Sequence, residues 1–351
     1  MTTISTPGRI CLFGEHQDYL GLPVIPMAIS VRCQISGKRS SDQNIYIHKP
    51  DIDERESFSL NNLEYSKSRD YFKSGMKICL KEGLIFSTGI DCKIKSDIPI
   101  QAGISSSSAI MVSWIHFLSK VADNPQNWTQ QKIGELAYKS EVLEFDEPGG
   151  MMDQYSTAVG GLVFLKSHPK ITIEKLNSNL GTFVIGDSQQ PKNTMGILKR
   201  CKETRLSILE KINKKSPNLD FSNIDFKDIN KFNLEKDEIN LLYGTIKNRN
   251  FLNLAKHEIS KDKLNKQYIG KLFNEHHKVL RDVLKISTPK IEKLIKVSLN
   301  AGAFGAKING SGGGGCMIAY APKNPEKILE SIENNGGKGF IVKTDLGTIE
   351  I

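Results

Sequence analysis

The sequence predicts a protein of two domains that contains both helices and strands, and three observations support this. Its 351 residues, 38% of them hydrophobic, suffice to bury a substantial core and to divide into two domains. Residues 1–185 mix strand patterns with glycine-rich turns, whereas residues 200–300 have the wider apolar spacing of helices. Strand patterns then return. The change of pattern near 180–190 predicts domains at 1–185 and 186–351.

The individual elements follow from local patterns of apolar residues. In the first domain, four segments read as strands: "VIPMAISVRCQISGKR" (24–39), "QNIYIHK" (43–49), "GIDCKIKSD" (89–97) and "GGLVFLKS" (160–167). In the second domain, "TPKIEKLIKVSLNAG" (288–302) is typical of the helices and "SNIDFKDINKF" (222–232) of the polar joints between them. Near the C-terminus, two further segments have a strand pattern: "GGCMIAYA" (314–321) and "GFIVKTDL" (339–346).

The composition argues against several classes of protein. No segment has about 18 uncharged apolar residues in a row and the first residues lack a signal-peptide pattern, so we expect neither membrane spanning nor secretion. The six cysteines are scattered without a C-x-x-C pair, which favours reduced thiols in the cytoplasm over disulfides or a zinc site. The net charge of +9 comes largely from lysines interleaved with acids over 192–296, which indicates a solvated basic face rather than a nucleic-acid surface.

The segment "IPIQAGISSSSA" (98–109) places four serines between a strand pattern and an apolar helical pattern. Small residues let the backbone approach a ligand, and N–H groups at the start of a helix carry positive partial charge. Phosphate is therefore the expected ligand, although the Gly-Lys-Ser/Thr of the common phosphate loop is absent. The alternative is a serine-rich helix cap that binds nothing.

A second glycine-rich segment, "GAKINGSGGGGCMIAY" (305–320), lies between a predicted helix and a predicted strand. Its glycines suit a turn with positive φ, or a backbone that must pass close to another part of the molecule. The alternative is a loose connection between helix and strand.

A third segment, "TPGRICLFGEHQDYLGLPVIPMAI" (6–29), crowds charged and polar side chains between two strand-like runs. They are Arg9, Glu15, His16, Asp18 and Tyr19. Each carboxylate can accept hydrogen bonds from two hydroxyls, so this arrangement suits a ligand that is rich in hydroxyl groups. An ordinary polar turn is the alternative.

In this order along the chain, the three segments resemble the signature motifs of the GHMP kinases, the superfamily of galactokinase, homoserine kinase, mevalonate kinase and phosphomevalonate kinase. "GRICLFGEHQDYLG" is most similar to the galactokinase signature, because mevalonate kinases share Gly-Glu-His but normally lack the following Asp-Tyr. "RDYFKSGMKICLKEG" (69–83) and "PGGMMDQYSTAVGGLVFL" (148–165) extend the likeness. Two departures stand out: Gln101 replaces the usual first Gly of the phosphate loop, and Ile10-Cys11 replaces the usual Asn-Leu.

The resemblance implies an α+β fold of two domains. The first would be like the second domain of ribosomal protein S5 and the other ferredoxin-like, with ATP and sugar in the cleft between them. The implied activity is that of an ATP-dependent sugar 1-kinase, which phosphorylates the anomeric hydroxyl of galactose or a close relative. A kinase for a uronic acid, a heptose derivative or mevalonate, and a non-catalytic sugar sensor, are the alternatives. Beyond sugar and ATP we expect no nucleic acid and no membrane as partners, and a monomer or homodimer.

The resemblance also assigns roles to single residues. Asp153, expected in the first turn of a helix, would be the catalytic base, and Arg9 would stabilise charge on the γ-phosphate. The alternatives are a capping carboxylate and a structural ion pair. The sugar is expected to bind Glu15, His16, Asp18 and Gly150. The ATP phosphates are expected to bind Gly103, Ser105, Ser106, Ser107, Ser108 and Gly312, with the loop 310–315 packed against the phosphate loop.

Mg²⁺ is expected at Glu141 and Ser107. Glu141 belongs to "TQQKIGELAYKSEVLEF" (129–145), a predicted helix capped by Thr129, and shares a stripe with Ile133 and Ala137. A carboxylate on an apolar stripe needs a partner, and Mg²⁺ is a suitable one, with a surface salt bridge as the alternative. The resemblance implies that Ser107 supplies the second protein oxygen.

Overall fold

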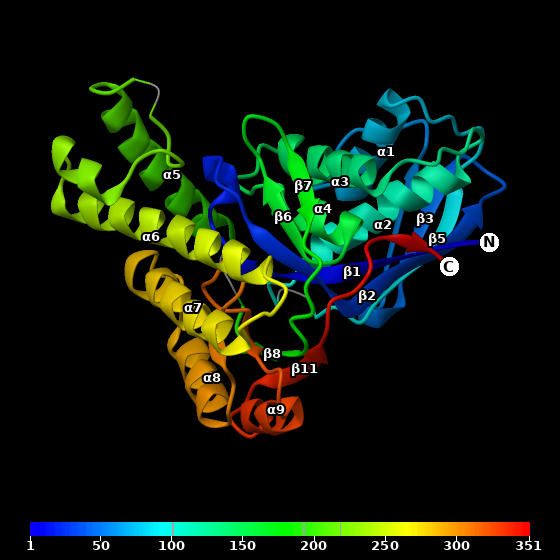
Figure 1. The fold of residues 1–351 in the computed structure, drawn as a ribbon. Coiled ribbons are helices and arrows are strands. Elements are labelled where there is room, and N and C mark those ends of the chain that lie inside the picture. The colour runs from blue at the N-terminus through cyan, green and yellow to red at the C-terminus, as the bar shows by residue number, and fades with distance from the viewer. Residues whose placement is uncertain (100–101, 192–193, 218) are drawn as a thin grey trace.

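The computed structural model describes residues 1–99, 102–191, 194–217 and 219–351 (Figure 1). Most helices and strands occur in the expected parts of the sequence. The segment 222–232, expected to be a polar joint, instead contains a 3-10 helix, Phe226–Lys231, which Asp225 caps. Gln101, singled out as a departure in the phosphate loop, lies outside the described residues. None of the described helices is long and apolar enough to cross a bilayer.

Within the described residues, the first half of the chain forms most of a six-stranded sheet of order β12-β1-β2-β5-β3-β4. β3 and β5 are parallel, and the other neighbouring pairs of this sheet are antiparallel. The register places Ile4 of β1 opposite Ile35 of β2, which puts apolar side chains on one face. The strands are β1 (Thr2–Phe13), β2 (Ile25–Arg39), β3 (Asn44–Lys49), β4 (Glu54–Ser59), β5 (Ile90–Ser96) and β12 (Ile349–Glu350). β6 (Val163–Lys166) and β7 (Thr172–Lys175) form a separate hairpin.

Helices cover that apolar face. α2 (Ser106–Val121) packs along β1 and β2, and α1 (Tyr71–Lys81), α3 (Gln130–Tyr138) and α4 (Met152–Val159) pack around α2. Trp114 of α2 is fully buried, and Gly75 of α1 allows the two helices to approach, because a Cβ there would lie 2.7 Å from the Trp114 ring. α2 is therefore the central helix of this layer.

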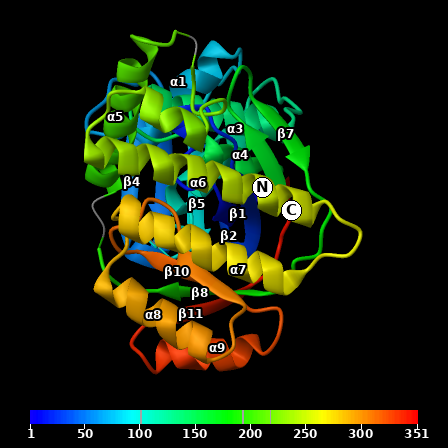
Figure 2. The same ribbon diagram turned by 60° about the vertical axis from the view of Figure 1, so that its left-hand side comes forward.

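A four-stranded sheet of order β11-β8-β10-β9 is described in the second half. Its strands are β8 (Phe183–Asp187), β9 (Gly305–Ile308), β10 (Cys316–Tyr320) and β11 (Lys338–Val342). α8 (Pro289–Asn300) and α9 (Pro325–Glu333) pack on this sheet, and α7 (Lys266–Lys278) lies along β9. α6 (Lys236–Ile259) contacts both α7 and β1, so the two helices connect the sheets (Figure 2). α5 (Thr194–Asn213) extends beside α6.

One apolar cluster joins the two halves of the molecule. Phe13 at the end of β1 lies 5.0 Å from the ring of Phe273 on α7, and Phe183 and Tyr320 of the second sheet stack at 4.9 Å. These aromatic side chains are fully buried in the same cluster. The loop that follows β1 is thus fixed to the second half.

The boundary expected between residues 185 and 186 falls inside β8, whose neighbours in the sheet are β10 and β11. β12 returns from the second half to the first sheet, where Glu350 lies opposite Ile4. The division into domains at 1–185 and 186–351 stays a prediction.

Candidate active site

A cavity of about 530 Å³ brings together the polar segments that the sequence singled out. All but one of the predicted site residues line it: Arg9, Glu15, His16, Asp18, Gly103, Ser105, Ser106, Ser107, Ser108, Glu141, Gly150 and Asp153. Gly312 is not among the lining residues and packs against Ile286 instead, since a Cβ at Gly312 would lie 2.5 Å from that of Ile286. From the same glycine-rich loop, Gly310 and Ser311 line the cavity.

The serine-rich segment forms the start of α2. Ser105 is the N-cap residue, with φ of 64°, and the following serines occupy the first helical turn. The N–H groups of that turn have no partner within the helix, and their partial positive charge suits an anion in the cavity. The sequence predicted this helix start correctly, and phosphate remains the expected ligand.

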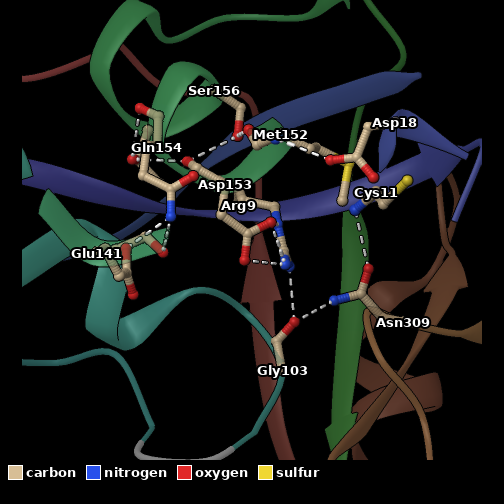
Figure 3. Close-up of polar contacts among 12 residues, drawn as sticks. Arg9, Cys11, Asp18, Gly103, Glu141, Met152, Asp153, Gln154, Ser156 and Asn309 are labelled. Atoms are coloured by element: carbon tan, nitrogen blue, oxygen red, sulfur yellow. Dashed lines mark hydrogen bonds and ion pairs between the residues drawn. The ribbon is translucent and has the colours of Figure 1, made fainter. Parts of the chain in front are cut away.

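Arg9 and Asp153 form a bidentate ion pair at the edge of the cavity (Figure 3). Arg9 Nε donates to Asp153 Oδ1 at 2.8 Å, and Nη2 donates to Oδ2 at 2.7 Å. Asp153 lies in the first turn of α4, as expected. Burial would lower the pKa of Arg9, but the charge of Asp153 raises it above its ordinary value. The side chain of Asp153 is 31% exposed and that of Arg9 only 5%, so the carboxylate is accessible and the guanidinium holds it in place.

The glycine-rich loop after β9 packs against the phosphate loop, as expected. Gly310 has φ of 75°, and a Cβ there would lie 2.9 Å from the carbonyl oxygen of Gly103. Both the positive φ and the close approach therefore require glycine at this position.

Glu141 reaches the cavity from a π-helical turn, Lys139–Leu143, that continues α3. Thr129 caps α3 as predicted, because its side chain accepts from the N–H of Lys132 at 3.2 Å. Glu141 is 5% exposed and its Oε2 accepts from Gln154 Nε2 at 2.6 Å. Burial raises its pKa to about 7, against the opposite effect of hydrogen bonds from Gln154, Ser108 and Ser107.

These groups fit a divalent cation. Glu141 is buried, and no ion pair within the described ranges includes it, so the surface salt bridge considered above is not found there. A buried carboxylate beside serine hydroxyls is a suitable set of oxygen ligands for Mg²⁺, and a bound cation would stabilise the charged form of Glu141. The described part of the chain contains no cluster of three or more His, Cys, Asp or Glu side chains that could hold a metal alone. Other oxygens of the shell would therefore have to come from elsewhere.

Asp18 lies directly against the N-terminus of α4. Its Oδ2 accepts from the N–H of Met152 at 3.1 Å, and its Oδ1 accepts from the N–H of Tyr19 at 3.0 Å. A Cβ on Gly150 would lie 1.9 Å from Asp18 Oδ2, so only glycine allows this approach. Burial raises the pKa of Asp18. The structure thus places Asp18 and Gly150 next to the turn that carries Asp153.

His16 is engaged by protein groups at both ring nitrogens. Its Nε2 is 3.1 Å from the carbonyl oxygen of Ser311, which can only accept, so the proton is on Nε2. Its Nδ1 then accepts from the hydroxyl of Tyr19 at 2.8 Å, and this hydroxyl accepts from Arg205 Nη2 at 2.7 Å. Burial and the charge of Arg205 lower the pKa of His16 to about 3, so the ring is neutral. Its role in sugar binding stays a prediction.

Glu15 takes part in a second buried ion pair, with Lys307 of β9. The Lys307 ammonium also donates to the carbonyl oxygens of Cys11, at 2.9 Å, and Ile308, at 3.1 Å. His276 Nε2 lies 3.5 Å from the second carboxylate oxygen. Burial raises the pKa of Glu15 and Lys307 opposes this effect. Sequence reasoning missed Lys307, although a lysine inside the strand-like run "GAKI" was a signal that a buried carboxylate had to be nearby.

Parts of this chain match models of known protein families. Three family models match: the GHMP kinases N terminal domain over residues 70–161, the GHMP kinases C terminal over 261–338, and the galactokinase galactose-binding signature over 2–39. A mevalonate kinase of Pyrococcus abyssi is 28% identical over 349 residues, which cover 97% of this chain and 94% of the relative. A galactokinase of Clostridium tetani is 27% identical over 376 aligned residues, which cover 100% of this chain and 92% of that relative.

Solved structures show the same fold. The structure of Lactococcus lactis galactokinase complexed with galactose superposes with a TM-score of 0.86 at 20% identity and covers 100% of this chain and 95% of its own. For the Methanococcus jannaschii mevalonate kinase the TM-score is 0.74 at 22% identity, with 98% of each chain covered. The two-domain α+β architecture that the sequence predicted is therefore confirmed.

Proposed function

We propose that this chain, which belongs to the GHMP kinase superfamily, transfers the γ-phosphate of ATP to the anomeric hydroxyl of galactose or a closely related neutral sugar. One observation carries the proposal. The accessible carboxylate of Asp153, held by Arg9, lies between a helix N-terminus suited to phosphate and the segment that carries Asp18.

The geometry supports distinct roles for the two charged groups. Asp153 would accept the proton of the sugar hydroxyl as its oxygen attacks the γ-phosphorus and the bond to the ADP oxygen breaks. Arg9 keeps the carboxylate oriented through two hydrogen bonds and carries positive charge to the place where negative charge develops. Because both side chains are already fixed, little reorganisation is needed. Mg²⁺ held by Glu141 and Ser107 would offset the charge of the ATP phosphates.

The charges of the cavity favour a neutral sugar. Its cationic lining residues in the described chain are Arg9, Lys49 and Arg69. Each pairs with an acidic side chain: Arg9 with Asp153, Lys49 with Glu56 at 3.1 Å and Arg69 with Glu147 at 2.7 Å. A substrate carboxylate or phosphate would have to compete with these acids. We therefore favour a neutral aldose over a uronic acid, a heptose phosphate or mevalonate.

Mevalonate is the second candidate substrate. Relatives such as the mevalonate kinase of Pyrococcus abyssi align over nearly the whole chain. The galactose-binding signature over residues 2–39 and the Asp18-Tyr19 pair within it favour the sugar. Because the chain is similar to both kinds of kinase, turnover must be measured with both mevalonate and sugars.

A substrate panel tests the proposal. ADP release would be measured with galactose, other neutral aldoses, galacturonate, a heptose phosphate and mevalonate, and phosphorus NMR would locate the new phosphate. We expect galactose or a close relative to give the highest kcat/KM and a sugar 1-phosphate as product. Faster turnover of mevalonate or galacturonate would overturn the substrate assignment. Calorimetric binding of a sugar without any turnover would instead indicate a sugar sensor.

A further inference from the structure

Asn309, in the glycine-rich loop after β9, connects three distant segments of the chain. Its Oδ1 accepts from the N–H of Cys11 on β1 at 2.9 Å, and its Nδ2 donates to the carbonyl oxygen of Gly103 at 2.9 Å. Asn309 is 1% exposed, so these bonds are shielded from water. Figure 3 shows the amide bridging β1 and the phosphate loop.

The carbonyl of Gly103 is the point where this bridge meets the ion pair. Besides Asn309 Nδ2, it accepts from Arg9 Nη1 at 2.7 Å. A carbonyl oxygen has two lone pairs, so the two donors use its full capacity. Two other donors of the Arg9 guanidinium, Nε and Nη2, each bond to one carboxylate oxygen of Asp153. The direction of one carbonyl therefore determines where the guanidinium lies, and the guanidinium determines where the carboxylate lies.

We propose that Asn309 is a positioning residue for phosphoryl transfer, which sets the Arg9–Asp153 pair through the carbonyl of Gly103. The inference rests on the proposed function. Asn309 is not among the residues that line the cavity, so it acts through other groups and not on substrate. It comes from the second half of the chain, whereas Cys11 and Gly103 belong to the first. The packing of the glycine-rich loop is thereby coupled to the geometry of the reacting groups.

Two substitutions separate positioning from simple structural support. Asn309→Asp keeps the shape of the side chain and an oxygen for the N–H of Cys11. It replaces the donor to Gly103 with a negative charge that repels this carbonyl and attracts Arg9 away from Asp153. Asn309→Ala removes both hydrogen bonds and adds no charge. Positioning therefore predicts that Asn309→Asp is the less active variant, whichever of the two variants has the higher melting temperature.

Asn124 provides a matched control. Its Oδ1 accepts from the N–H of Ile85 at 2.8 Å and its Nδ2 donates to the carbonyl of Gly83 at 2.9 Å, the same type of bridge at a place that does not line the cavity. Asn124→Asp and Asn124→Ala should leave kcat unchanged. For Asn309→Asp we expect kcat to fall by about 10²-fold, with KM for sugar and ATP within a few-fold of wild type, because small displacements of reacting groups have effects of this size.

A measurement without turnover completes the test. The side-chain Nε–H of Arg9 should give a slowly exchanging signal in nitrogen-15 NMR spectra, identified by its loss in Arg9→Lys. We expect this signal to shift and exchange faster in Asn309→Asp and to be unchanged in Asn124→Asp. Activity losses that follow the order of thermal stability, together with an unchanged Arg9 signal, would overturn the inference. If wild type turns over no substrate of the panel, the proposed function fails, and the Arg9 signal alone decides the inference.

Discussion

Two buried ion pairs begin from the same segment of the chain, and they differ in what surrounds them. Arg9 pairs with Asp153, whose side chain is 31% exposed to the cavity. Glu15 pairs with Lys307, and these side chains are 1% and 0% exposed. A pair with one accessible carboxylate can exchange a proton with a ligand. Glu15 is also among the residues that line the cavity, but its pair with Lys307, the sealed pair, is almost fully buried and joins the two halves of the molecule, so its expected role in sugar binding stays a prediction. The comparison teaches that accessibility, more than the presence of charges, separates the proposed catalytic group, Asp153, from a structural one.

The largest effect is expected on the accessible side of this comparison. Asp153→Asn keeps the shape of the side chain but removes the proton acceptor, so kcat should fall by about 10²–10⁴-fold. A moderate fall in melting temperature is also expected, because the amide offers Arg9 one acceptor in place of two and leaves its buried charge without a counter-charge. Asp345→Asn is the control, since Asp345 forms a similarly exposed pair with Arg32 and should leave kcat intact. Near-normal turnover of a folded Asp153→Asn protein would show that the base is another group.

The sealed pair should respond in the opposite way. Lys307→Met leaves the Glu15 carboxylate buried without its cation, and we expect a loss of about 3–5 kcal/mol in the free energy of unfolding. Adding Glu15→Gln should recover part of this loss, because the uncompensated charge is removed. Denaturant unfolding of the two single variants and the double variant measures both effects. Additive losses would contradict coupling between these side chains.

Glu141 sharpens the comparison, since no ion pair of the described residues includes it. Its pKa is raised to about 7 in the folded protein, from 4.5 in a solvated chain. The folded state therefore binds more protons between these values, and its stability without Mg²⁺ should decrease as pH rises through 7. We expect a loss of about 2–4 kcal/mol across this window. Glu141→Gln should remove this contribution and leave those of Glu15 and Asp18, whose pKa values burial also raises, whereas Glu144→Gln, at an exposed position, should retain it.

The smallest effect is expected for Ser107→Ala. One oxygen beside Glu141 is lost while the N–H groups at the start of α2 remain, so the protein should still bind ATP. The Mg²⁺ concentration for half-maximal activity should rise by a few-fold, with a modest decrease in kcat. Titration of activity with Mg²⁺ at saturating ATP measures this. An unchanged Mg²⁺ dependence would assign Ser107 to the helix cap alone.

Local structure could be predicted from the sequence to a large extent. The Thr129 cap, the helix that starts at the serines and the position of Asp153 in a first turn all depend on neighbouring residues. Apolar spacing likewise identified the helices of residues 200–300. The return of β12 to the first sheet was not predictable, because two residues paired over more than three hundred leave no local pattern.

Residues of the site could be predicted from the sequence only where they belong to a recognisable motif. The segment 305–320 was singled out for its glycines, but two of its other side chains, Lys307 and Asn309, make the contacts that connect the halves. Arg205 was missed as well, since its partner Tyr19 lies far away in sequence. Such residues act through long-range contacts, and their significance appears only when the chain is folded.

The π-helical turn Lys139–Leu143 has a consequence for how this sequence tolerates insertions and deletions. The N–H of Glu144, which follows the turn, donates to the carbonyl oxygen of Lys139, five residues earlier. An α-helix would make this bond four residues earlier, so the turn contains one extra residue. Removing a single residue of the turn before Glu141 would restore α-helical spacing and rotate Glu141 and the side chains after it by about 100° about the helix axis. The Glu141 carboxylate would then leave the serine hydroxyls. Across related chains, a one-residue gap at this turn would therefore accompany a different position of this carboxylate relative to the cavity, even where every neighbouring residue is the same.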